Sequence, residues 1–105
     1  MKRQPKFALI FAPETIEHLD FIEQKYHRLI QKTIDEQLTY TPDQETRNRK
    51  SLEEPAPFGA TWELRCGPRN RFRVFYDIAA DEVEILAIGV KEGNRLFIGG
   101  EEYIG

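Results

Sequence analysis

The chain contains a single cysteine, Cys66, among its 105 residues, so it cannot form an internal disulfide. This is typical of proteins from a reducing compartment. The sequence has no Cys/His cluster with zinc-ligand spacing and no Gly-rich loop followed by the Lys and Ser/Thr of a P-loop. Ser51 has no placeable His and Asp partners. The common catalytic signatures are therefore lacking, and we expect neither a metal nor another cofactor.

Long hydrophobic runs are also lacking. The longest, residues 7–12, is far shorter than the roughly 20 residues that a membrane-spanning helix needs. Pro13 interrupts this run too early for a signal peptide. The composition, 40% hydrophobic and 31% charged, is ordinary for a soluble globular protein. We expect one cytoplasmic domain over residues 1–105, without membrane association.

Histidines are few, and they do not suggest a metal site. His18 and His27 are nine residues apart, which on one helix places them on opposite faces. They would then be unable to bind one metal together. Cys66 alternates with Trp62 and Leu64 along a predicted strand, which favours a packed thiol over a reactive one.

The N-terminal part of the sequence predicts a strand followed by helix. Residues 6–11 form a short apolar run, and Pro13 suits the first turn of a helix. Apolar residues then follow helical spacing from Ile16 to Leu38, which predicts one long helix or two helices joined near residues 26–27. Residues 39–61 carry two closely spaced prolines and are expected to form a surface loop.

Three consecutive strands are predicted at residues 62–67, 71–78 and 83–90, because β-branched and aromatic residues dominate there and turn residues separate them. Residues 95–98 suit a short edge strand. The expected fold is α+β, with an N-terminal strand and one or two helices packed on an antiparallel sheet of about four strands.

Charge is distributed unevenly along the chain. Residues 65–73 contain four arginines and no acid in a chain of net charge −3, whereas residues 14–45 contain eight acids and three bases. Side-chain alternation places Arg65 with Glu63, and Arg73 with Phe75 and Asp77. An antiparallel meander can bring both arginines onto one face, where they could bind phosphate beside an aromatic platform from Phe75 or Trp62. In the alternative interpretation, the two arginines pair with Glu63 and Asp77 and merely keep the face soluble.

These three strands, together with Arg49-Lys50-Ser51-Leu52 upstream, resemble the sheet signature of the RelE/ParE superfamily of bacterial toxins over residues 47–98. The resemblance implies two N-terminal helices on an antiparallel sheet and a role as the toxin of a type II toxin–antitoxin pair. Members of the RelE-like branch cleave mRNA in the ribosome without metal, the ribose 2′-hydroxyl attacking the adjacent phosphate. The implied partners are a cognate antitoxin, the ribosome and mRNA.

The resemblance also assigns roles to individual residues. Arg65 and Arg73 match basic residues expected to bind or neutralise the scissile phosphate, and Lys91 is a candidate proton donor. Residues expected to contact nucleic acid are Arg47, Arg49, Lys50, Arg69, Arg71, Phe75, Arg95 and Phe97.

Two positions depart from the RelE pattern. Glu63 stands where that pattern has lysine, and Phe97 stands where it has tyrosine, with Tyr103 nearby as a possible substitute. The ParE-like branch instead targets DNA gyrase and does not depend on these residues. The alternatives are therefore a gyrase inhibitor, a catalytically impaired antitoxin-binding module, or a housekeeping RNA-binding domain.

Overall fold

A computed structural model describes residues 6–53 and 56–104. Two helices, three short 3₁₀ turns and seven strands form within these residues. In chain order they are β1 (Ala8–Phe11), α1 (Glu14–Asp20), η1 (Gln24–Tyr26), α2 (His27–Leu38), β2 (Arg49–Ser51), η2 (Pro57–Gly59), β3 (Trp62–Cys66), η3 (Pro68–Asn70), β4 (Phe72–Ala79), β5 (Glu82–Glu92), β6 (Arg95–Ile98) and β7 (Glu101–Glu102).

The strands form one sheet in the order β2-β3-β4-β5-β6-β7, and neighbours on this path run antiparallel. β1 joins the same sheet by pairing parallel with β5. It uses residues 82–85 of β5, whereas β6 uses residues 89–92. Since β4 occupies the other edge of β5, β1 and β6 share one edge of that strand, end to end. Residues 86–88 are left between them on that edge.

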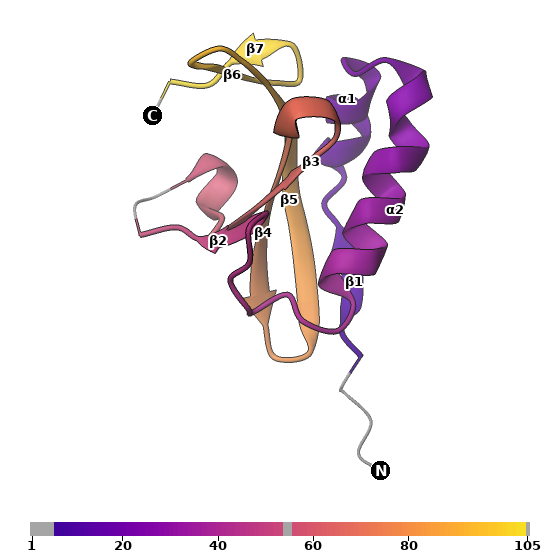
Figure 1. Cartoon of the computed structure of the whole chain (residues 1–105), viewed down its shortest axis with the longest axis vertical. Helices are drawn as coiled ribbons and strands as arrows, with labels where there is room; N and C mark the ends of the chain where they lie inside the picture. The colour runs from indigo at the N-terminus through magenta and orange to yellow at the C-terminus, as the bar shows by residue number, and fades with distance from the viewer. Residues whose placement is uncertain (1–5, 54–55, 105) are drawn as a thin grey trace.

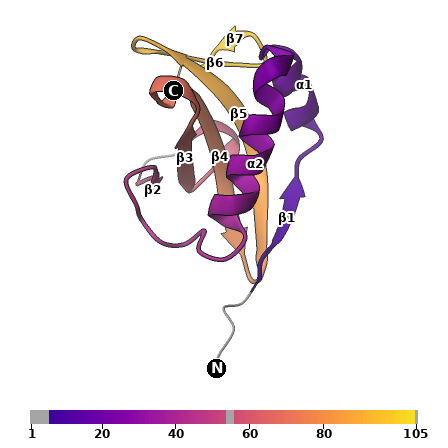
Figure 2. The same ribbon diagram turned by 45° about the vertical axis from the view of Figure 1, so that its right-hand side comes forward.

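Both helices lie on one face of the sheet (Figures 1 and 2). Ile30, Ile34 and Leu38 recur every four residues along α2, so their side chains form one stripe, and all three are fully buried. They pack in one core cluster with Leu64, Val74, Tyr76 and other apolar residues of the central strands. The Tyr76 hydroxyl in this core donates a hydrogen bond to the Pro42 carbonyl oxygen at 2.7 Å, which anchors the chain after α2.

The α+β class, the two helices and the antiparallel pairing of the central strands are confirmed. The helices separate at residues 21–26, and η1 ends at Tyr26, where a junction was expected. The prediction of about four strands is wrong, because the sheet contains seven. β2 was missed because Arg49, Lys50 and Ser51 carry no apolar alternation, and they join the sheet through backbone pairing with β3. No helix among the described residues is long and apolar enough to span a membrane.

Candidate nucleic-acid interface

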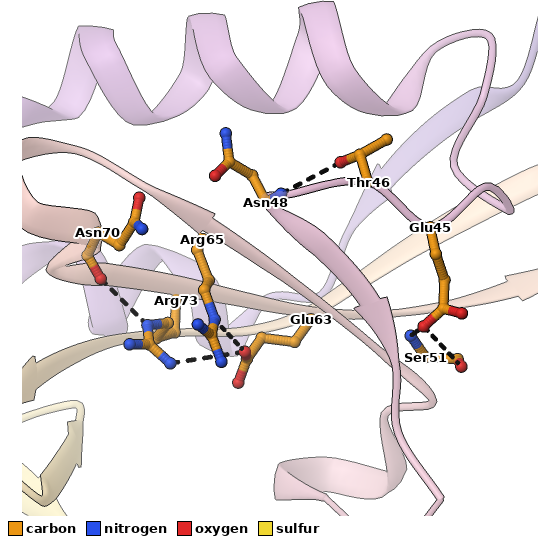
Figure 3. Close-up of polar contacts among 8 residues, drawn as sticks. All are labelled: Glu45, Thr46, Asn48, Ser51, Glu63, Arg65, Asn70 and Arg73. Atoms are coloured by element: carbon orange, nitrogen blue, oxygen red, sulfur yellow. Dashed lines mark hydrogen bonds and ion pairs between the residues drawn. The ribbon is translucent and has the colours of Figure 1, made fainter.

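Arg65 and Arg73 lie directly opposite each other on β3 and β4, as side-chain alternation predicts. Both guanidinium groups approach the same carboxylate oxygen, Oε1 of Glu63 (Figure 3). The Arg65 Nε–Oε1 distance is 3.0 Å and the Arg73 Nη1–Oε1 distance is 3.5 Å. Like charges directly opposite on a sheet repel, so the carboxylate between them stabilises the pair. Glu63 thus serves two cations and leaves this cluster with one net positive charge.

The two arginines differ in accessibility. The Arg65 side chain is 35% exposed, whereas the side chains of Arg73 and Glu63 are 14% and 12% exposed. Burial lowers the pKa of the Arg73 guanidinium, Glu63 opposes that shift, and Arg65 adds to it. Pairing of both arginines with Glu63 is therefore confirmed. Pairing with Asp77 is not found, because the Asp77 carboxylate accepts a hydrogen bond from Thr61 at 2.6 Å.

A second group of cationic side chains lies beside this cluster. An open pocket of about 570 Å³ lies between the β3–β4 turn and the β5–β6 turn, and we call it the cationic pocket. Its lining residues are Pro68, Arg69, Asn70, Arg71, Arg73, Lys91 and Gly93. This lining holds four cationic residues and no carboxylate among the residues that the structure describes. A polyanion could thus meet Arg73 and Lys91 together with two arginines of the turn.

Backbone conformation holds this pocket in shape. Gly67 has φ +82°, and a Cβ there would lie 2.3 Å from Cδ2 of Phe72, so the start of the turn requires glycine. Arg69 and Asn70 follow in the left-handed region at φ 56° and 54°, which is strained for residues other than glycine. The Asn70 carbonyl oxygen accepts a hydrogen bond from Arg73 Nε at 3.1 Å (Figure 3). Consequently the turn and the Arg73 side chain are fixed relative to each other.

Arg49 does not belong to this surface, which corrects its predicted contact with nucleic acid. It is 6% exposed, and its Nη1 donates hydrogen bonds to the backbone carbonyl oxygens of Gln37 and Thr41. Its Nε donates to the hydroxyl of Thr46 at 3.4 Å. The guanidinium therefore closes the end of α2 onto the following loop and has no free face for phosphate. Arg47 and Lys50 are exposed, and Lys50 lies opposite Glu63 in the sheet register.

Of the two predicted aromatic contacts, that of Phe75 is corrected. Phe75 is only 3% exposed and packs with Ala60, Ala87 and Ile98, so its ring cannot stack on a base. Phe97 pairs with Val90, whereas Lys91 pairs with Leu96, and alternation therefore places Phe97 and Lys91 on opposite faces.

Arg95, also predicted to contact nucleic acid, contacts two neighbouring side chains. Its guanidinium lies 5.1 Å from the Phe97 ring centroid. It also makes two hydrogen bonds to the Glu102 carboxylate, at 2.9 and 3.2 Å. Tyr103 follows in the chain, and its backbone N–H donates to the Leu96 carbonyl oxygen at 2.8 Å, one strand away from Lys91.

Cys66 is packed in the core, as its place in the strand pattern predicts. Cys66 is 5% exposed, and burial raises the pKa of its thiol to about 11, so the packed thiol is confirmed.

His18 and His27 lie on different helices, so the single-helix geometry used to separate them was wrong. No group of three or more His, Cys, Asp or Glu suited to a metal ion exists among residues 6–53 and 56–104.

Sequence reasoning missed two residues that line a further pocket, His18 and Phe21. Both follow the acidic start of α1, and helical spacing gives no signal for their role. Only the fold shows it, because the sheet edge that His18 contacts comes from β5, 70 residues later in the chain.

Comparison with known proteins returns no relative for this chain: no protein-family model, no curated protein and no solved structure matches it.

Proposed function

We propose that this chain is the toxin of a type II toxin–antitoxin pair, and that it cleaves mRNA on the ribosome as RelE-like toxins do. The observation that carries this proposal is the cationic pocket, in which Arg69, Arg71, Arg73 and Lys91 meet without a lining carboxylate among the described residues. Arginine forks and a lysine ammonium group are the donors that phosphate binding uses. The sheet signature in the sequence supports the same assignment, and a cognate antitoxin would cover the pocket with acidic side chains.

The proposed reaction needs three roles. As the 2′-oxygen bonds to phosphorus, its proton must leave to a base, charge grows on the phosphate, and the departing 5′-oxygen must gain a proton. Arg65 and Arg73 would neutralise the phosphate, and the Lys91 ammonium group would protonate the 5′-oxygen. Glu63 would accept the 2′ proton: both arginine contacts go to its Oε1, and its side chain also lines an open pocket on this face. The products are a 2′,3′-cyclic phosphate and a 5′-hydroxyl.

A reconstituted translation reaction with one defined mRNA tests the proposal, with cleavage mapped by primer extension. We expect cuts only when ribosomes are present. Arg73→Ala should reduce the cleavage rate by about 100-fold or more, as when a preorganised charge-stabilising group is lost. Arg28→Ala, at an exposed position of α2, should leave it unchanged. Uncut mRNA together with normal protein synthesis would refute the proposal.

A specific observation also favours a second candidate, a binding module without nuclease activity. Glu63 already neutralises one of the charges of Arg65 and Arg73, and Phe97 lies on the other face of the sheet from Lys91. Such a module would inhibit DNA gyrase, as ParE-like toxins do, or bind only an antitoxin. A supercoiling assay with the purified protein separates these outcomes, because only a gyrase poison traps cleaved DNA.

A further inference from the structure

A second, smaller pocket lies on the helix side of the sheet, near the Gly99–Gly100 turn. We call this volume of about 200 Å³ the aromatic pocket, since Phe21 and Phe97 line it together with His18 and Arg71. None of the roles in the proposed cleavage reaction falls to His18 or to either phenylalanine. The chemistry of this pocket therefore needs its own explanation.

His18 offers a solvent-accessible hydrogen-bond donor here. The residue is 6% exposed, and its Nδ1 accepts a hydrogen bond from the Ile88 backbone N–H at 3.2 Å. Because Nδ1 is the acceptor, the proton of the neutral ring is on Nε2. Burial lowers the pKa of His18, which favours this neutral form, although Glu14 and Glu17 oppose the shift. Among the described residues the hydrogen bond found for this ring is the one at Nδ1, and no buried side-chain nitrogen or oxygen lacks a partner, so Nε2 is open to solvent.

The pocket exists because two glycines form part of its wall. Gly100 has φ +81°, and a Cβ there would lie 2.5 Å from Cδ1 of Phe21. The Phe21 ring therefore rests against bare backbone, while the residue remains 64% exposed. A Cβ on Gly99 would lie 3.4 Å from Cδ2 of His18, so the same turn also approaches the imidazole. Two phenylalanine rings and an imidazole edge thus surround a space suited to one flat ring system.

Arg71 connects this pocket with the cationic pocket, because it lines both. Its guanidinium lies 3.9 Å from Glu23 Oε1 and 3.7 Å from Glu92 Oε1, and both acidic side chains are 60% exposed. Ion pairs this long and this exposed contribute little free energy. Arg71 can therefore leave them for a phosphate without a large cost.

From these contacts we infer that the aromatic pocket is a nucleobase subsite. It takes one base of an RNA strand whose phosphate lies on Arg71, at the rim of the cationic pocket. The base stacks on Phe21 and Phe97, and a ring nitrogen or keto oxygen accepts the His18 Nε2–H. This inference rests on the proposed function, since it assigns the subsite of the same RNA. A phenylalanine or tryptophan side chain of a protein partner has no acceptor for His18, and no aromatic side chain carries an anion for Arg71, which is why a nucleotide is favoured.

Titration of the full chain with nucleoside monophosphates, followed by NMR, tests the subsite. We expect saturable shifts at His18, Phe21 and Phe97 with at least one nucleotide, and none there with inorganic phosphate. Phe21→Ala should weaken nucleotide binding by about tenfold or more, because one stacking surface is lost. Arg71→Gln should reduce the affinity for the nucleotide to that for its nucleoside.

Phe58 provides a matched control. Its ring centroid lies 5.5 Å from that of His18, and it is 56% exposed, yet it does not line the aromatic pocket. Phe58→Ala should therefore leave nucleotide affinity unchanged, and an equal loss in both phenylalanine variants would overturn the subsite. Neither residue is part of the buried core, so both variants are expected to fold.

The outcomes separate this inference from the proposed function. Shifts confined to Arg69, Arg73 and Lys91, identical to those from inorganic phosphate, would overturn the nucleobase subsite and leave the cleavage proposal standing. Binding of N-acetyl-tryptophanamide without binding of any nucleotide would assign the pocket to a peptide side chain and overturn it as well. Nucleotide binding by a protein that leaves mRNA uncut on the ribosome would keep the subsite and refute the nuclease.

Discussion

Glu63 decides how much positive charge the sheet face offers. The register puts Arg65 and Arg73 side by side, and one carboxylate oxygen between them receives both guanidinium groups. A lysine at this position would leave three cations together, whereas glutamate leaves one net charge. The cations that Glu63 does not pair with lie toward the turn, at Arg69, Arg71 and Lys91, and Arg71 makes only long, exposed ion pairs with Glu23 and Glu92. The arginine-rich residues 65–73 and the lining of the cationic pocket therefore overlap only in part, because Arg65 does not line the pocket and Lys91 comes from β5.

Arg49 is expected to be the arginine whose loss most reduces stability. Arg49→Ala leaves the carbonyl oxygens of Gln37 and Thr41 without the Nη1 donor and should lower the free energy of unfolding by about 2–3 kcal/mol. The matched control is Arg47→Ala, two residues away and exposed, which should change it by less than about 0.5 kcal/mol. Urea denaturation followed by tryptophan fluorescence measures both. Equal stability of the two variants would contradict the structural role of Arg49.

The sequence predicted some of these residues and not others, for a physical reason. Alternation within two adjacent strands suffices to bring Arg65 and Arg73 together, because the strands are joined by a short turn. The burial of Arg49 depends on carbonyl groups at the end of α2, and the burial of Phe75 depends on Ala60, Ala87 and Ile98. Those partners come from other elements, and no local pattern identifies them.

At the scale of elements, the outer edge of β5 is completed from three sources. β1 pairs with its first part, β6 pairs with its last part, and the His18 ring accepts the Ile88 N–H between them. α1 therefore contributes to the sheet edge as well as to the core. Because His18 must be unprotonated at Nδ1 to do so, the junction depends on pH.

We expect the protein to lose stability as the pH falls from 7 to 5. Burial lowers the folded-state pKa of His18 below its ordinary value of 6.5, so the unfolded chain takes up the proton first. The stabilisation is complete above about pH 7, begins to decline near the unfolded-state pKa, and is lost once the pH has fallen through the folded-state pKa. Thermal melts between pH 5 and 8 measure this decline.

His18→Asn is the informative variant for this prediction. An asparagine oxygen can accept the Ile88 N–H near the Nδ1 position, and the amide does not titrate. Its melting temperature should vary less with pH over the same range than that of the parent. A parent and a variant with the same pH dependence would show that another group is responsible.

Element prediction succeeded where the pattern was long and local. The stripe of α2 and the alternation of β3 and β4 were readable, and their boundaries were close to those found. In β5 the register shifts opposite Phe75 and Tyr76, which pair with Ala87 and Ile85, so Leu86 is the extra residue. Such a bulge depends on the partner strand. The three-residue β2 and the two-residue β7 likewise exist only as additions to strands already formed.

Over the whole molecule, acidic and cationic residues are unevenly distributed. Eight of the 18 acidic residues lie in residues 14–45, whereas the cationic pocket is lined by residues of η3 and of the β5–β6 hairpin. A net charge of −3 would repel RNA at long range, but at physiological salt fields decay over about 8 Å. An RNA strand in the pocket is therefore affected mainly by the charges that lie within that distance.

The salt dependence of RNA binding reports how many cations that pocket contributes. If Arg69, Arg71, Arg73 and Lys91 each neutralise one phosphate of a single strand, a plot of log K against log salt should have a slope of about −2.8. Arg69→Gln combined with Lys91→Gln should reduce the magnitude of that slope by about 1.4, since each released counterion contributes about 0.7. Fluorescence anisotropy with a labelled oligonucleotide measures it.

The control is Arg28→Gln with Lys32→Gln, two exposed cations of α2, which should leave the slope unchanged. If the Arg28→Gln/Lys32→Gln variant reduced the slope by the same amount, RNA would be attracted by diffuse charge over the whole protein. That result would show that the cationic pocket is not the binding site.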